Sequence, residues 1–209
     1  MKKLLGILVL GLFLITPSYA DDKRDFQVKG KYYALILGNN DYKYLTKLDN
    51  AINDAKVLAG ILENKYGFEV KLLIDGDRDT TIDSLYEISR KLKKNDKLLI
   101  YYSGHGEFDK QEERSYWLPV DASYESRSRW ISDLFIMDQI FATDSLHVLR
   151  VDDTCFSGKP RLRGVDHSIF LENVTNYPKT LSLRRDSLYV QKILKRKTKI
   201  FITSGDIEP

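Results

Sequence analysis

One apolar run in the sequence breaks off abruptly into polar and small residues, and this break constrains the fold more than any other feature. Residues 148–151 are mostly β-formers, and the segment that follows reads Asp152-Asp153-Thr154-Cys155-Phe156-Ser157-Gly158. The run predicts a short strand, and the break carries the only cysteine of the 209 residues. Such a strand delivers one thiol to the carboxyl edge of a sheet, where open α/β folds bind their ligands.

A second apolar run ends in the same manner. Residues 97–102 lead into Ser103-Gly104-His105-Gly106. If the two strands are parallel neighbours, His105 and Cys155 leave the sheet at the same edge. A free thiol has a pKa of about 8.5, and a nearby imidazole is the usual means of forming the thiolate at neutral pH. The two stretches together predict a Cys–His pair for nucleophilic catalysis.

The two other histidines are weaker candidates for the base. His147 precedes the cysteine strand and is expected at the opposite sheet edge, roughly 20 Å from the thiol at ~3.3 Å per strand residue. His167 lies in a segment where nothing fixes it. For Cys155 the alternative is a small buried hydrophobe, the usual state of a free cysteine. The carboxylates of Asp152 and Asp153, directly before it, argue against that alternative.

The rest of the chain alternates strands and helices. Besides the two strands above, strands are expected at residues 31–37, 69–74 and 199–205. Helices are expected at residues 50–65 and 133–141. Between them, another helix is expected to begin after a cap at Thr80 or Thr81. Residues 107–130 form an insertion, 159–180 a long loop, and a basic helix then extends to about residue 197. This order predicts an α/β fold: an open, mainly parallel sheet flanked by helices, with right-handed crossovers.

The two polar boxes, Tyr-Ser-Gly-His-Gly and Asp-Asp-Thr-Cys-Phe-Ser-Gly, resemble those of the caspase-like cysteine peptidases, and most closely those of bacterial relatives of metacaspases. The 50 residues between His105 and Cys155 agree with the caspase hallmark of about 50. The resemblance implies a caspase-like domain over residues 31–209 and an endopeptidase with a Cys155–His105 dyad. It also implies that backbone N–H groups of Cys155 and Gly106 stabilise the oxyanion. The resemblance also implies further chain after the last strand and Thr203-Ser204-Gly205, so the domain is expected to be truncated at its C-terminal end.

Asp54 is the unusual residue of the first predicted helix, because it shares the apolar face of Ala51 and Leu58. It either benefits from the helix dipole in the first turn or points into a pocket. A carboxylate beside the nucleophile would raise the thiol pKa and not lower it, so it does not serve to activate the cysteine. Its alternative role is to select a basic side chain in the substrate. The resemblance implies that the pocket for the residue before the cut consists of Asp54, Ser103 and Asp153. The expected substrate is a protein or peptide with Arg or Lys at the cut site, and carboxylates match the planar fork of Arg well.

The N-terminal residues have the pattern of a secretory signal peptide. Lys2 and Lys3 precede 12 apolar residues, and Ser18 and Ala20 fit the small-residue positions before a cleavage site. We therefore expect cleavage after Ala20, export to the periplasm or beyond, and a loose lead-in at residues 21–30. The apolar run is shorter than the roughly 20 residues of a membrane-spanning helix, so no stable membrane anchor is expected.

Charge and motifs exclude some partners. With Lys2 and Lys3 removed from 33 basic residues, 31 remain against 30 acidic ones, which is no electrostatic footprint for nucleic acid. No cofactor is expected. The resemblance makes calcium possible, but Asp133 alone does not define a metal site, and none is assigned.

Two other functions compete with the peptidase. A receiver-like magnesium and phosphate site would need a lysine that closes a later strand, and Thr203-Ser204-Gly205 provides none. A catalytically inactive caspase-fold scaffold or binding module remains the alternative if the truncated end is essential. The basic stretch 184–199 is either a solvated helix face or a segment processed by the enzyme itself. The candidate processing sites are Arg161, Arg163 and Arg185.

Overall fold

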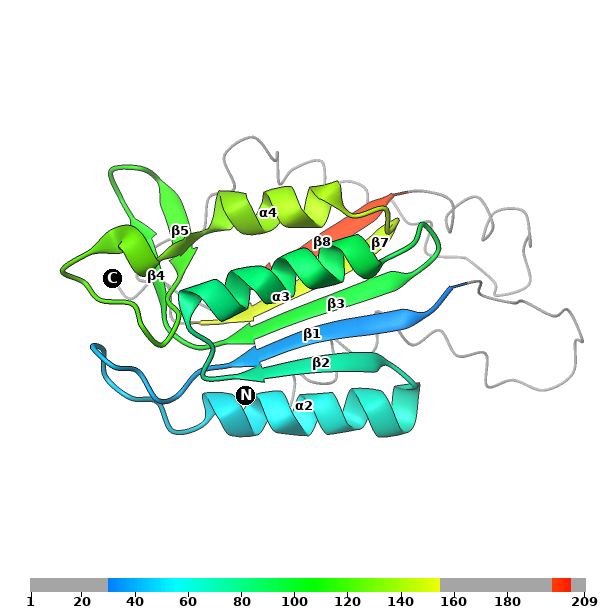
Figure 1. The fold of residues 1–209 in the computed structure, drawn as a ribbon, viewed down its shortest axis with the longest axis horizontal. Helices are drawn as coiled ribbons and strands as arrows, with labels where there is room; N and C mark the ends of the chain where they lie inside the picture. Colours follow the sequence, from blue (N-terminus) through cyan, green and yellow to red (C-terminus); the bar gives the residue numbers. More distant parts are fainter. Residues whose placement is uncertain (1–29, 155–196, 204–209) are drawn as a thin grey trace, which may run out of the picture.

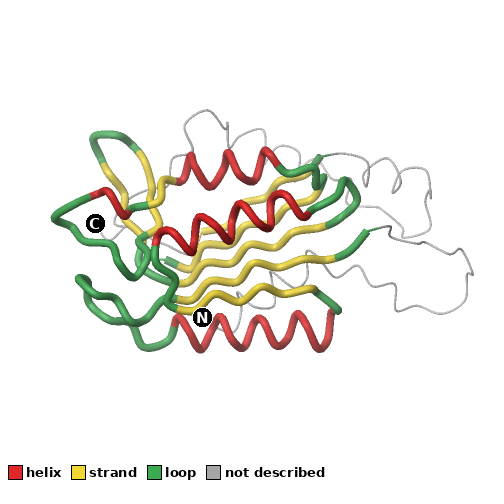
Figure 2. The backbone as a smooth tube through the Cα atoms, viewed as in Figure 1, coloured by secondary structure: helices red, strands yellow, loops and turns green. Residues whose placement is uncertain are grey.

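The computed structural model describes residues 30–154 and 197–203, and its centre is a five-stranded parallel sheet. The strands lie in the order β2-β1-β3-β7-β8, and every neighbouring pair is parallel (Figures 1 and 2). Their bounds are Tyr32–Gly38 for β1, Glu69–Ile74 for β2, Lys97–Ser103 for β3, His147–Asp153 for β7 and Thr198–Thr203 for β8. The predicted α/β fold with an open parallel sheet is confirmed.

Helices cover both faces of this sheet (Figure 1). Helix α2 (Ala51–Tyr66) packs on one face, and helices α3 (Arg78–Lys91) and α4 (Asp133–Ala142) pack on the other. Successive side chains of β1 alternate between the two layers: Ala34 and Ile36 contact the α2 side, whereas Leu35 and Leu37 contact the α3 and α4 side. A strand buried on both faces has to be apolar at consecutive positions, which explains the uninterrupted runs in the sequence.

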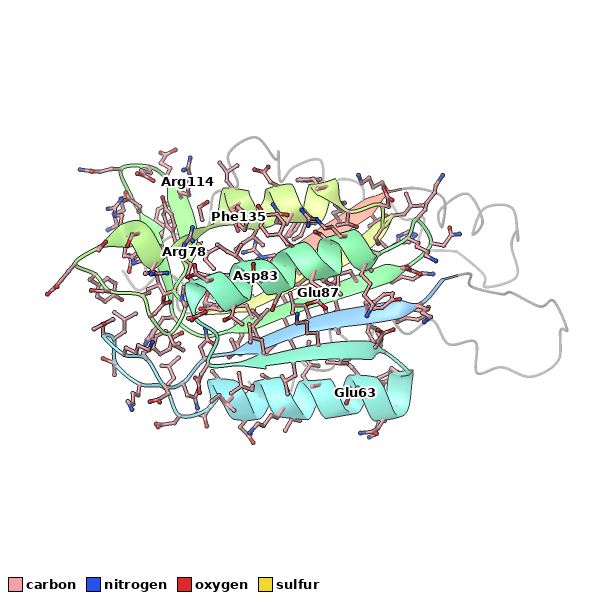
Figure 3. The ribbon with its side chains drawn as sticks, in the orientation of Figure 1. Glu63, Arg78, Asp83, Glu87, Arg114 and Phe135 are labelled. Carbon is pink, nitrogen blue, oxygen red and sulfur yellow. The ribbon has the colours of Figure 1, made fainter. Side chains whose placement is uncertain are left out.

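Many charged side chains of the helices point away from these two layers. Glu63 on α2 and Asp83 and Glu87 on α3 lie on exposed faces (Figure 3). Among the residues that the structure describes, no helix is long and apolar enough to cross a membrane.

The start of α2 lies unusually close to the carboxyl end of β1. A Cβ added to Gly38 would lie 2.7 Å from the Cβ of Ala55 and 2.8 Å from the carbonyl oxygen of Ala51. Real Cβ atoms do not approach other atoms so closely, so only glycine fits there. This contact brings the first turn of α2, with Asp54, to the edge of the sheet at which the strands end.

One prediction about local structure was wrong, and one segment has more regular structure than expected. The cap of α3 is Asp77, whose Oδ1 accepts a hydrogen bond from the backbone N–H of Thr80 at 2.8 Å; neither Thr80 nor Thr81 is the cap. The insertion 107–130 contains regular structure that the sequence had not indicated. It contributes most of a three-stranded antiparallel sheet of β4 (Gly106–Asp109), β5 (Arg114–Trp117) and β6 (Ile131–Ser132), with a short 3₁₀ turn at Arg127–Arg129. The predicted signal peptide, the loop 159–180 and most of the basic helix lie outside the described residues.

Candidate active site

Three strands of the main sheet end at the same level. In the strand pairing, Gly38 of β1 lies opposite Ser103 of β3, and Ser103 lies opposite Asp153 of β7. The predicted neighbours β3 and β7 are therefore adjacent and parallel. His105 follows two residues after the end of β3, and Cys155 follows two residues after the end of β7 in the sequence. Cys155 itself lies outside the described residues.

The imidazole of His105 has a defined orientation. Its Nε2 lies 2.7 Å from the backbone carbonyl oxygen of Thr46, in the loop between β1 and α2. A carbonyl oxygen can only accept, so Nε2 carries the proton in this hydrogen bond and Nδ1 holds the lone pair of the neutral ring. The Tyr42 ring packs against the imidazole, with centroids 4.6 Å apart. Nothing in the sequence pattern pointed to Thr46, because a backbone carbonyl has no residue signature.

The turn that carries His105 is held by two buried tyrosines. The backbone N–H of His105 donates to the hydroxyl of Tyr42 at 2.7 Å. The carbonyl oxygen of His105 accepts from the hydroxyl of Tyr102 at 2.8 Å and from the backbone N–H of Leu118 at 3.0 Å. Both backbone groups of His105 are thus fixed, and the turn has little freedom.

Burial keeps these tyrosines neutral. Burial raises the pKa of Tyr42 to about 12, although the hydrogen bond with the His105 backbone opposes this shift. Burial also raises the pKa of Tyr102 well above its ordinary value, and the neighbouring Tyr42 raises it further. Both hydroxyls keep their protons at physiological pH, so these hydrogen bonds do not change with pH in that range.

Gly104 is required by packing. A Cβ at this position would lie 2.7 Å from the Tyr42 hydroxyl oxygen and 2.9 Å from the Tyr102 hydroxyl oxygen. The next glycine, Gly106, is buried and pairs with Trp117 between β4 and β5. The two glycines of the Ser-Gly-His-Gly box therefore let the backbone pass close to the groups that hold His105.

A second group of polar side chains lies on the α2 face of the same edge. The hydroxyl of Tyr101 donates to Oδ2 of Asp153 at 3.1 Å. Ser103 follows Tyr101 by two residues and lies directly opposite Asp153. Burial raises the pKa of Tyr101, the charge of Asp153 raises it further, and Asp54 makes a smaller contribution in the same direction. The structure therefore brings Ser103 and Asp153 together beside Tyr101, and Asp54 is close enough to influence the pKa of that tyrosine. Tyr101 was not among the site residues predicted from the sequence.

Asp152 and Asp153 have different environments, although they are adjacent in the sequence. Asp152 is buried on the opposite face of β7 and accepts two hydrogen bonds from Arg150, from Nε at 2.9 Å and from Nη2 at 2.6 Å. Its negative charge is therefore neutralised within the protein. A charged residue within an apolar strand run is the sequence signal for this pair.

No metal site is visible in the ranges 30–154 and 197–203, where no group of three or more His, Cys, Asp or Glu side chains could hold an ion. Asp133, which the calcium hypothesis singled out, accepts a hydrogen bond from Nη1 of Arg150. Of the other histidines, His147 is the first residue of β7, at the amino edge of the sheet as predicted, and His167 lies outside the described residues.

Known proteins resemble this chain in sequence family and in fold. A sequence model of the caspase domain matches residues 31–201. Among solved structures, the chain is similar to the crystal structure of protein GSU0716 from Geobacter sulfurreducens, with a TM-score of 0.55 and 22% identity. That match covers 83% of this chain and 72% of the other, and at this identity it shows the fold alone. No curated protein matches the chain.

Proposed function

Because the chain belongs to the caspase-domain family of cysteine peptidases, we propose that it is a metacaspase-like endopeptidase that cuts proteins after arginine or lysine. One observation carries the proposal. The His105 ring donates through Nε2 to Thr46, which leaves Nδ1 as the basic nitrogen at the edge where β7 leads toward Cys155. A general base with a fixed tautomer, which follows the strand adjacent to the cysteine strand, suits nucleophilic catalysis by a thiol.

The proposed reaction is acyl transfer to the thiol. Nδ1 of His105 takes the proton of Cys155, and the thiolate attacks the carbonyl carbon of the scissile peptide bond. Backbone N–H groups of Cys155 and Gly106 stabilise the oxyanion. His105 then gives the proton to the leaving amine, and water hydrolyses the thioester with His105 again as the base. The Thr46 carbonyl stabilises the imidazolium form by accepting a hydrogen bond from Nε2–H.

The charges at the sheet edge support the preference for a basic residue. Asp153 accepts a hydrogen bond from the Tyr101 hydroxyl on the α2 face, and Asp54 is close enough to raise the pKa of the same tyrosine. The third nearby carboxylate, Asp152, is paired with Arg150 and faces the other layer. A guanidinium or ammonium group is the substrate group that complements two carboxylates and the Ser103 hydroxyl.

The mature enzyme is proposed to act outside the cytoplasm, after removal of residues 1–20. The chemistry requires no cofactor, and calcium as an activator stays a prediction of the resemblance. The competing function is an inactive scaffold with the same fold. The measurable difference from the peptidase is that a scaffold does not cleave peptides.

Fluorogenic peptides that end in Arg, Lys or Asp test the proposal on the full chain. We expect release of the fluorophore after Arg and Lys but not after Asp. Activity is expected to disappear in Cys155→Ala and in His105→Ala, whereas the control His147→Ala, at the opposite sheet edge, should keep it. Absence of turnover for all three peptides, or turnover that survives Cys155→Ala, would refute the peptidase.

A further inference from the structure

Arg150 is a buried cation inside the apolar run 148–151 of β7, and the proposed chemistry does not use it. Its side chain is 3% exposed and lies on the α3 and α4 face of β7. Three of its nitrogens donate: Nε and Nη2 to the two oxygens of Asp152, and Nη1 to Asp133 at the first turn of α4. Burial lowers the pKa of Arg150, but the attraction of Asp152 and Asp133 outweighs it, so the net pKa is raised.

A buried ion pair of this kind is poor evidence for stability. The desolvation of the charges offsets much of their attraction, and apolar replacements of whole pairs are often neutral or stabilising. The ion pair does fix the relative orientation of its partners, because the planar guanidinium of Arg150 binds the carboxylates of Asp152 and Asp133 at the same time. Here the guanidinium connects the end of β7 with the start of α4, the element that precedes β7 in the chain.

The same guanidinium also contacts the antiparallel sheet. The Cζ atom of Arg150 lies 4.8 Å from the ring centroid of Trp117. Trp117 in turn stacks on Tyr102, with centroids 4.4 Å apart and an interplanar angle of 9°. Arg150, Trp117 and Tyr102 therefore form one contiguous buried cluster between the two sheets.

This cluster ends at the backbone of His105. Trp117 pairs with Gly106 in the β4–β5 ladder, and the residue after Trp117, Leu118, donates its N–H to the carbonyl oxygen of His105. The Tyr102 hydroxyl donates to the same carbonyl oxygen and also contacts the carbonyl oxygen of Leu118 at 2.9 Å. Every group that holds the C-terminal side of His105 is thus connected to Trp117 or Tyr102.

We propose that Arg150 is a positioning residue for His105: through Trp117 and Tyr102 it fixes the turn that aims the imidazole. The inference rests on the proposed function only for its effect on catalysis, because the orientation of His105 can be measured without a substrate. A lysine at position 150 would keep the positive charge. It could not contact both Asp152 and Asp133 as the guanidinium does, and it would lose the planar contact with Trp117.

Arg150→Lys tests this in the full chain by two readouts. The first is the exchange with water of the Nε2 proton of His105, which the bond to Thr46 protects and which is followed by NMR. We expect exchange to be faster by at least about tenfold, since a small shift of the turn lengthens that bond. The second is the turnover of an Arg peptide: kcat should fall about tenfold to hundredfold. KM should stay unchanged, since Asp54, Ser103 and Asp153 lie on the α2 side.

Arg90→Lys is the matched control. The guanidinium of Arg90 also lies over an aromatic ring, 5.4 Å from the Tyr86 centroid, but on the exposed side of α3. This variant should leave Nε2–H exchange and kcat at their wild-type values. If Arg150→Lys fails to fold, Asp133→Asn replaces it, because it removes one of the two carboxylates that hold the guanidinium. It should also accelerate the exchange.

Each outcome decides the inference. A lower melting temperature with wild-type proton exchange and wild-type kcat per folded molecule would mean that Arg150 is merely structural, and the inference would be wrong. The inference would also be wrong if the Nε2 proton of Asp133→Asn, used in place of Arg150→Lys, exchanged with water as slowly as in the wild type. It would equally be wrong if the Nε2 proton of the wild type showed no protection from exchange. If the wild type cleaves no peptide but Arg150→Lys still accelerates exchange, the proposed function fails and the positioning role of Arg150 stands.

Discussion

The hydroxyl of Tyr42 accepts a hydrogen bond from the backbone N–H of His105 at 2.7 Å, while the two rings pack with their centroids 4.6 Å apart. Tyr42 lies in the loop after β1, and the same loop supplies the Thr46 carbonyl oxygen that accepts from Nε2. One loop therefore holds both the backbone and the ring of the proposed base, and its packing should control the position of His105.

Tyr42→Phe should weaken both the fold and the activity. The variant keeps the ring contact but leaves the N–H of His105 without its acceptor in a site where Tyr42 is only 2% exposed. An unsatisfied buried donor costs about 1–3 kcal/mol, which urea denaturation would measure. Tyr44→Phe is the control in the same loop, because Tyr44 is 69% exposed, and it should be neutral. Equal stability of the two variants would contradict this account of the turn.

Gly104→Ala should be destabilising by about 1–3 kcal/mol, since the new methyl group overlaps the hydroxyls of Tyr42 and Tyr102 that hold His105. Thermal unfolding checks the change in stability, and the fluorogenic peptide checks the accompanying loss of activity. Gly60→Ala is the opposite control. Gly60 lies inside α2, the nearest atom to an added Cβ is 3.9 Å away, and alanine there should stabilise the helix by about 0.5–1 kcal/mol. A Gly104→Ala variant as stable as the wild type would show that the turn has more room than the structure indicates.

Tyr101→Phe should impair substrate binding more than catalysis. It removes the hydroxyl that donates to Asp153 without touching His105, so the carboxylate loses a contact that orients it. A hydrogen bond to a charged group contributes about 1.5–3 kcal/mol, so KM for an Arg peptide should rise about tenfold with little change in kcat. Tyr33→Phe, a buried tyrosine on the other face of the sheet, serves as the control. A fall in kcat at constant KM would argue against Asp153 as part of the substrate pocket.

Lys199 should make stability depend on alkaline pH. Burial lowers its pKa from 10.5 to about 8, with a smaller contribution from Lys197, although its Nζ donates to the carbonyl oxygen of Ile140. Below pH 8 the amine is charged in both states and its burial is unfavourable. As the pH rises from about 8 toward 10.5, the folded state loses the proton before the unfolded state does, so this group stabilises the fold increasingly.

Lys199→Met removes that dependence. We expect the free energy of unfolding of the variant, relative to the wild type, to decrease steadily between pH 8 and pH 10, measured by urea denaturation at each pH. The expected sign follows because only the wild type gains stability in this window. A difference that stays constant with pH would mean that Lys199 titrates normally in the folded protein.

The sequence was sufficient to predict the five strands of the main sheet and their common direction, because each is an apolar run bounded by turn residues. It also predicted that the runs before His105 and Cys155 are parallel neighbours that end at one edge of the sheet, as the register of β3 and β7 shows. The features that were missed are local details that the hydrophobic period does not show. Asp77 replaces Thr80 as the cap through a single side-chain oxygen, and the antiparallel sheet of the insertion is too short to show a period.

Arg150 and Tyr101 illustrate the other limit. Both are within strand runs, where residue type alone does not tell which layer a side chain enters or what it meets there. Their partners, Asp133 for Arg150 and Asp153 for Tyr101, are separated from them by 17 and 52 residues. Only the register of β3 and β7, together with the position of α4, brings these pairs into contact.

The most direct test of the central claim is covalent labelling of the sole cysteine by a peptide ketone that carries Arg next to the reactive carbon. Intact-mass spectrometry should show one adduct on Cys155 in the wild type, none in His105→Ala on the same timescale, and far slower labelling by the Asp analogue. Equal labelling of the wild type and His105→Ala by both reagents would contradict the claim, because the thiol would then react without help from His105 and without recognition of a basic side chain.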